Sequence, residues 1–163
     1  ISNLDSADYL VLTDAENELK TKTATIEQIQ TLFGIDTLVA KVTVNTGSLL
    51  TLGNTPITLI AAPGANKVID IISISQYLDA GTTQFNFGNN LLVKIGATTF
   101  GTLFAQSANF ATDLVSKIGV GGSTYVIDQN TAVTLETAAN PSQGNGTMYF
   151  NIFYRILNVG TSF

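Results

Sequence analysis

The hydrophobic pattern of residues 37–163 is that of short β-strands separated by turn sequences. Apolar and polar side chains alternate over 38–44, which predicts a strand with one buried face. Short apolar runs follow between stretches rich in glycine, asparagine and threonine, and we expect strands at 49–52, 57–60, 67–78, 84–87, 91–95, 125–127 and 132–135. Between 98 and 122 the apolar positions recur loosely, every three to four residues, so we expect a loop with one or two helical turns there.

The clearest strand is 147–157. One face would carry Met148, Phe150, Ile152, Tyr154 and Ile156, and the other Tyr149, Asn151, Phe153, Arg155 and Leu157. Because one apolar face suffices for a sandwich core, we expect Tyr149, Phe153 and Leu157 to contribute to an interface between copies of the chain. The run 68–72 is apolar on both faces, which predicts a central strand between two layers.

Eight or nine short strands without alternating helices indicate an all-β fold, a β-sandwich of the jelly-roll type. Residues 37–163 would form this sandwich, and residues 1–36 would form a separate module. The module is predicted to contain two strands, 9–13 and 19–24, around a polar turn. A helix would begin at Thr25, where Thr25-x-x-Gln28 has the spacing of a capping box.

The N-terminal module has too few apolar residues for a core of its own, so we expect it to dock on another surface. The candidate docking residues are the apolar positions of its first strand and of one helix face: Tyr9, Leu10, Leu12, Ile26, Ile29 and Leu32.

Charge divides the chain at the same point. Residues 1–36 contain seven acidic side chains and two lysines, a balance of −5, whereas residues 37–163 contain five acidic and five basic ones. Ten charged side chains in 127 residues are few, because roughly 25% of residues are charged in an average domain. Such a charge-poor segment is typical of a surface that is covered in an oligomer or a larger assembly.

Composition argues against several classes of chemistry. The sequence has no cysteine or histidine, so thiolate metal sites and the usual serine nucleophile with its histidine base are excluded. The isoelectric point near 4.4, without a basic cluster, argues against a nucleic-acid partner. No apolar run is long enough to span a membrane, and no pattern indicates a cofactor or a metal.

Acidic pairs are the remaining enzymatic possibility. The candidates in the β part are Asp70, Asp79, Asp113, Asp128 and Glu136. Pairing with a base or exposure to solvent is the favoured interpretation of each, with Lys67 or Arg155 as the expected partner of Asp70. The glycine-rich segment 119–124 lacks the lysine of a phosphate-binding loop, so we expect a flexible loop and no enzymatic activity.

Aromatic side chains leave a second possibility open. Aromatic rings stack on the apolar faces of sugars, and the candidates are Tyr77, Phe85, Phe87 and Tyr125. Packing in the core or in an interface is the favoured interpretation of these residues.

Two parts of the sequence resemble proteins of tailed bacteriophages. Residues 1–4, 8–14 and 23–29 are similar to a short repeat that precedes the main body of phage fibre proteins. Residues 54–69 and the ending 144–156, a glycine turn before a strand that closes in Tyr-Arg-Ile, resemble segments of phage virion-associated β domains.

The resemblance implies a trimeric jelly-roll domain on a virion, in a head fibre, a capsid decoration or a tail fibre. The resemblance assigns no catalytic residues to this chain. The leading hypothesis is therefore a non-enzymatic virion protein whose partners are itself, as a homotrimer, and other virion proteins of the capsid or tail. The alternative is a fibre tip that attaches to a host-surface glycan.

Overall fold

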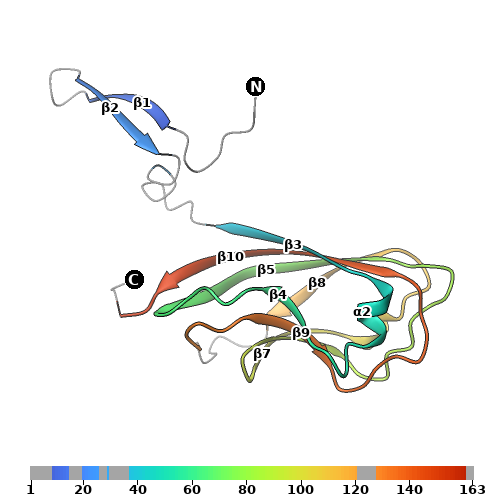
Figure 1. Cartoon of the computed structure of the whole chain (residues 1–163). Coiled ribbons are helices and arrows are strands. Elements are labelled where there is room, and N and C mark those ends of the chain that lie inside the picture. The colour runs from blue at the N-terminus through green and yellow to red at the C-terminus, as the bar shows by residue number, and fades with distance from the viewer. Residues whose placement is uncertain (1–8, 15–19, 26–28, 30–36, 121–127, 161–163) are drawn as a thin grey trace. The chain divides into compact units, whose positions relative to one another are not determined.

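The protein was analysed as a computed structural model, which describes residues 9–14, 20–25, 29, 37–120 and 128–160 (Figure 1). The chain divides into two compact units, Ile1–Thr37 and Leu38–Phe163. In the first unit, β1 (Tyr9–Asp14) and β2 (Lys20–Thr25) pair as an antiparallel hairpin, which confirms both predicted strands. The helix predicted from Thr25 lies outside the described residues apart from Ile29, and Thr25 itself ends β2.

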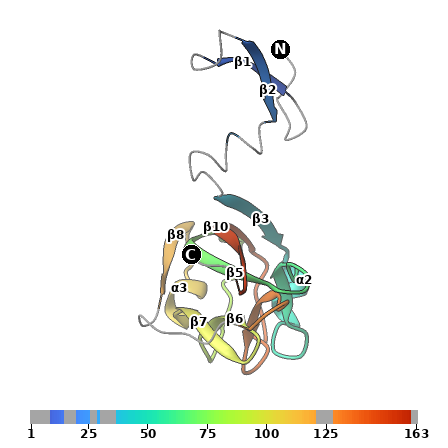
Figure 2. The same ribbon diagram turned by 90° about the vertical axis from the view of Figure 1, so that its left-hand side faces the viewer.

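The second unit is a sandwich of two four-stranded layers (Figure 1 and Figure 2). One layer has the order β3-β10-β5-β8, with bounds Leu38–Val44, Thr147–Asn158, Lys67–Asp79 and Leu114–Val120. The other has the order β7-β6-β9-β4, with bounds Thr98–Leu103, Leu91–Ile95, Val133–Thr137 and Ile57–Ile60.

All the strand pairs in this unit are antiparallel, and the two layers join through two residue pairs between β7 and β8. Successive strands from β3 to β10 alternate between the two layers, except that β6 and β7 follow each other within one layer. This is the strand order of an eight-stranded jelly roll. The predicted fold class, an all-β sandwich of jelly-roll type, is confirmed.

The core lies between the two layers and follows the predicted alternation. On β10, Met148, Phe150 and Ile152 are fully buried, whereas Tyr149 on the other face is exposed. Residues 91, 93 and 95 of β6 and residues 133 and 135 of β9 are buried in the same way from the facing layer. Burial of this single apolar side of each sheet is what holds the two layers together.

The predicted strand at 49–52 is wrong. The segment begins with α2 (Thr46–Leu50), and the side chain of Asn45 caps it by accepting a hydrogen bond from the Ser48 amide at 3.0 Å. Leu49 and Leu52 are both buried, so the apolar run reflects burial and not strand periodicity. Short apolar runs do not distinguish a buried helical turn from a strand.

The predicted strand at 84–87 is also wrong, because this segment is an irregular loop whose Phe85 and Phe87 rings are buried. The loop predicted over 98–122 instead contains strands β7 and β8, with one helical turn, α3 (Ala105–Ala108), between them. The predicted strand at 125–127 lies outside the described residues.

Strand β5 is central within its sheet, between β10 and β8, but not between two layers as predicted. Its register with β10 shifts beside Ile72, whose exposed fraction is 46%. The described residues of the chain therefore leave the outward side of this strand uncovered at Ile72, whereas Val68 near its start is buried.

Candidate assembly surface

The outward side of the β3-β10-β5-β8 sheet is assembled from every second residue of its four strands. The strand register aligns one row across the sheet, Thr43, Tyr149, Tyr77 and Val115, and a second row beside it, Lys41, Asn151, Ser75 and Lys117. We call this side the apolar face. Its further members are Val39 and Phe153, which pair with each other, and Ile72 and Leu157.

Exposed hydrophobic side chains concentrate on the apolar face. Val115 is 70% exposed and Tyr149 is 40% exposed, and Val39, Ile72 and Tyr77 are exposed as well. None of the large exposed hydrophobic side chains among the described residues belongs to β4, β6, β7 or β9. One sheet of the sandwich therefore has an unpartnered apolar surface, and the other does not.

The outward side of the opposite sheet carries polar and charged side chains, as is typical of a solvent-exposed surface. Thr58 of β4 is exposed, and the half-buried outward positions of β9 are Thr134 and Glu136. Lys94 of β6 forms an ion pair with Glu136. This contrast between the two sheets argues that the apolar face has a partner of its own.

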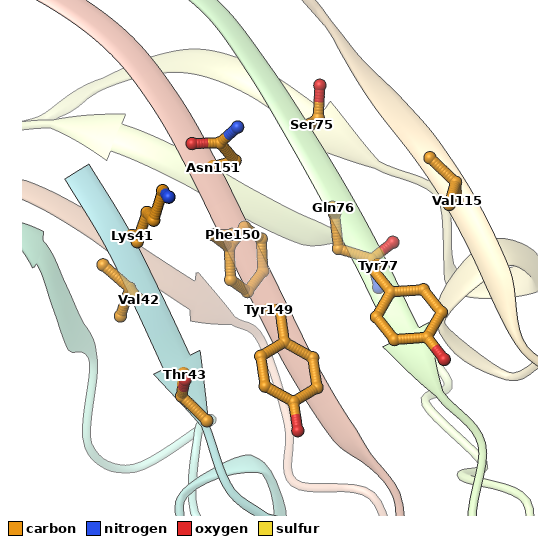
Figure 3. Close-up of a pocket in the computed structure, with 10 residues that line it drawn as sticks. All are labelled: Lys41, Val42, Thr43, Ser75, Gln76, Tyr77, Val115, Tyr149, Phe150 and Asn151. Carbon is orange, nitrogen blue, oxygen red and sulfur yellow. The ribbon is translucent and has the colours of Figure 1, made fainter. Parts of the chain in front are cut away.

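A shallow groove of about 300 Å³ runs over the apolar face (Figure 3). Its walls come from all four strands of the sheet: the groove is lined by Lys41, Val42, Thr43, Ser75, Gln76, Tyr77, Val115, Tyr149, Phe150 and Asn151. The rings of Tyr77 and Tyr149 are stacked, with their centroids 5.8 Å apart and an angle of 25° between the planes. The two rings together form an aromatic platform at the groove.

Asp113 fixes the orientation of this platform. The Tyr77 hydroxyl donates a hydrogen bond to Asp113 Oδ2 at 2.8 Å, and the Ala80 amide donates to Asp113 Oδ1 at 3.0 Å. The hydrogen bond to the Asp113 carboxylate raises the pKa of Tyr77 above its ordinary value of 10.0, because the bond requires the protonated hydroxyl. The platform is therefore held in one geometry before any partner binds.

The apolar face also carries polar and charged groups, among them Lys41 and Lys117 of its second row. Arg155 pairs with Asp70 across β10 and β5, with Nε 3.1 Å from Oδ2, which confirms one of the two partners predicted for Asp70. The side-chain oxygen of Asn151 is buried without a hydrogen-bond partner among the described residues. A buried acceptor without a partner costs free energy, and a donor from another molecule would remove this cost.

The carboxylates predicted as candidates for catalysis serve structural roles where the structure describes their contacts. Asp70, Asp113 and Glu136 each bind a different partner, namely Arg155, the Tyr77 hydroxyl with the Ala80 amide, and Lys94. The described residues contain no cluster of three or more potential metal ligands. No helix in the described segments is long and apolar enough to cross a membrane.

The three residues predicted for an interface all lie on β10 and on the apolar face. Tyr149 is exposed, and Phe153 and Leu157 are half-buried. Sequence reasoning missed Val39, Ile72 and Val115 at this surface. The alternation over 38–44 was the available signal for Val39, but Val115 lies in a strand that the sequence did not predict.

The residues predicted for docking belong to the first unit. Tyr9, Leu10 and Leu12 lie in β1, but their side chains are outside the described part, as are Ile26 and Leu32. Ile29 is half-buried. Their docking role therefore stays a prediction.

The residues considered for sugar stacking do not form one surface. Phe85 and Phe87 are both buried, with ring centroids 5.5 Å apart, which confirms that they pack in the core. Tyr125 lies outside the described residues, and Tyr77 is part of the apolar face.

Comparison with solved structures finds this fold in a bacteriophage capsid. A chain from the capsid asymmetric unit of cyanophage Pam1 aligns with a TM-score of 0.54 and 18% sequence identity, over 74% of this chain and 84% of that chain. The chain shares its fold with a phage capsid chain. A chain from the capsid of Ralstonia phage GP4 aligns with a TM-score of 0.42 and 16% identity, over 78% and 86% of the two chains. No protein-family model and no curated protein sequence matches the chain.

Proposed function

We propose that this chain is a non-enzymatic structural protein of a tailed-bacteriophage virion, and that it forms a homotrimer through its apolar face. The observation that carries the proposal is the restriction of the exposed hydrophobic strand residues to one sheet of the sandwich. The jelly roll that the chain shares with a Pam1 capsid chain supports a place in the virion, as do its phage-like sequence segments.

Self-association accounts for the charge distribution of the β unit. Residues 37–163 have a net charge of zero, and two pairs of their charged side chains are already neutralised within one copy. Closed symmetry places equivalent residues of the copies near one another, and like charges there would repel. In the row of Tyr77, Tyr149 and Val115 the side chains are uncharged and avoid this repulsion, whereas the row beside it carries Lys41 and Lys117.

The first unit has a different role in this proposal. It carries the whole net charge of −5, and its hairpin has only two strands. A two-stranded hairpin is marginally stable alone in water and gains stability by packing on another surface. The unit would therefore dock the trimer on a neighbouring virion protein, as part of a fibre or a capsid decoration.

Light scattering coupled to size-exclusion chromatography tests the proposal on the full chain at micromolar concentration. A homotrimer would have three times the chain mass of 17.2 kDa, about 52 kDa. A stable species of 17.2 kDa would contradict self-association. An image of the intact phage particle in which this chain is located would test the virion assignment separately.

A further inference from the structure

Four loops of the jelly roll gather at one end of the sandwich and contain one charged side chain, Asp113. They connect β3 to β4, β5 to β6, β7 to β8 and β9 to β10, and their uncharged stretches are 45–56, 80–90, 104–112 and 138–146. We call these stretches the loop end. Asparagine, glutamine, serine, threonine and glycine dominate it. A protein surface in water normally mixes charges of both signs, so a neutral surface of this size is unusual.

Hydrogen bonds across the loops hold the loop end in place. The Gly53 amide donates to Asn140 Oδ1 at 2.7 Å, which joins the β3–β4 and β9–β10 loops. The Ser142 amide donates to Asn86 Oδ1 at 2.8 Å, which joins the β9–β10 and β5–β6 loops. Binding to a surface ordered in advance costs less conformational entropy than binding to mobile loops.

A shallow pocket of about 520 Å³, wide open to solvent, lies between the β5–β6 and β7–β8 loops. It is lined by Gln84, Gln106, Asn109, Phe110, Ala111 and Thr112. Asn109, a lining residue, ties the two loops together, because its side chain accepts from the Phe87 amide at 2.7 Å and donates to the Phe87 carbonyl at 2.8 Å. Phe110, which lines the pocket, is 47% exposed.

We propose that this pocket binds a neutral saccharide. An exposed aromatic ring offers the apolar face on which a pyranose ring stacks, and Phe110 provides it. The exposed side chains of Gln106 and Thr112 supply donors and acceptors for sugar hydroxyls. Gln84 supplies its Oε1 acceptor, because its Nε2 donates to the Asn109 carbonyl. The pocket thus combines an apolar surface with a few convergent polar groups, the arrangement of a small-ligand site.

The charge pattern selects neutral over acidic sugars. The four loops have no lysine or arginine to pair with a carboxylate or a sulfate. The charged residue that follows the pocket along the chain is Asp113, whose carboxylate would repel an anionic ligand.

This site is separate from the apolar face and does not rest on the proposed homotrimer. The saccharide site belongs to the loop end, whereas the proposed contacts between copies belong to the outward side of one sheet. The same protein sample therefore gives independent results for the two proposals.

The test is isothermal titration calorimetry of the full chain with a panel of neutral oligosaccharides and their sialylated or sulfated counterparts. We expect at least one neutral oligosaccharide to bind and its acidic counterpart to bind at least about tenfold more weakly. Phe110→Ala should weaken binding about tenfold. The matched control is Phe104→Ala, which removes an exposed ring from the same loop outside the pocket and should leave the affinity unchanged.

Gln106→Leu supplies a second variant with little risk to folding, because Gln106 is exposed. It should also weaken binding, and thermal melting verifies that each variant is folded. The proposal is overturned if no neutral saccharide binds, if only acidic ones bind, or if Phe104→Ala weakens binding as much as Phe110→Ala. If Phe110→Ala prevents the chain from attaching to the virion and no saccharide binds, the loop end contacts protein. That result would also overturn the saccharide proposal.

Discussion

Substitution of Val115 by lysine should dissociate the proposed oligomer while leaving the fold intact. Val115 lies on β8 in the central row of the apolar face and is 70% exposed in the single chain. Exposed surface substitutions normally change the free energy of unfolding by less than about 0.5 kcal/mol. In an oligomer that covers this face, the same lysine would place three ammonium groups in an apolar interface.

The size of the effect follows from burial. Complete burial of a valine side chain stabilises by about 1.5–3 kcal/mol. Since 70% of Val115 is still exposed, about 1–2 kcal/mol of this remains for an interface. Burial of an unpaired ammonium adds a penalty of several kcal/mol, which the flexible side chain reduces to about 2 by reaching toward water. The total, about 3–4 kcal/mol per copy, lowers the association constant by two to three orders of magnitude for each copy in the oligomer.

Light scattering and sedimentation velocity measure the outcome at several protein concentrations. We expect Val115→Lys to shift the mass toward one chain, with an unchanged melting temperature for the monomer. Thr58→Lys is the matched control, because it places the same charge on an exposed, β-branched position of the opposite sheet. An oligomer that survives Val115→Lys, or that dissociates equally in both variants, would refute the assignment of the interface to the apolar face.

Three further predictions concern stability and ionisation. Gly144→Ala should lower the free energy of unfolding by about 3 kcal/mol in urea denaturation, because its φ is +134° and an added methyl group meets a buried phenylalanine ring. The control is Gly64→Ala, at φ +98° in open space, which should lower it by only about 1 kcal/mol. Equal losses in the two variants would contradict this prediction. Gln76→Leu should raise that free energy by about 1–2 kcal/mol, because both buried amide atoms lack hydrogen-bond partners among the described residues; a decrease would show that the amide is bonded in the assembled protein. Asp113→Asn should lower the pKa of Tyr77 toward 10.0 in an ultraviolet titration of tyrosinate, because it removes the carboxylate that accepts the Tyr77 hydrogen bond. The stability that this hydrogen bond provides is present below pH 10 and is lost as the pH rises through the raised pKa of Tyr77. An unchanged titration would mean that the hydrogen bond is absent in solution.

The parts of the fold that the sequence predicted correctly are those in which one periodic pattern decides the structure. Strands β3, β4 and β6 have the predicted bounds, and both faces of β10 have the predicted residues. In β3, β6 and β10 one side faces the opposite sheet, so the period of two appears directly in the sequence, whereas β4 was predicted from a short apolar run in which Leu59 and Ile60 are both buried.

The prediction failed where burial and periodicity diverge. Leu49 and Leu52 are apolar because a helical turn is buried at the end of the core, and local sequence does not distinguish this from a strand. Strand β8 was missed because its outward Val115 is as apolar as its inward Ile118, which hides the alternation. Phe85 and Phe87 alternate like strand residues, although the Asn109 side chain holds their segment as a loop.

The sequence by itself determined the class of the fold, the division of charge between the two units and the outward position of Tyr149, Phe153 and Leu157. These properties depend on local periodicity and on composition, which the order of residues states directly. Only the tertiary structure decided what lies beside those residues. Tyr77 is 72 positions from Tyr149 in the chain, and the pairing of β5 with β10 is what stacks their rings. The apolar face and the uncharged loop end both arise from such pairings between distant segments, because the jelly roll brings together strands and loops that no local pattern connects.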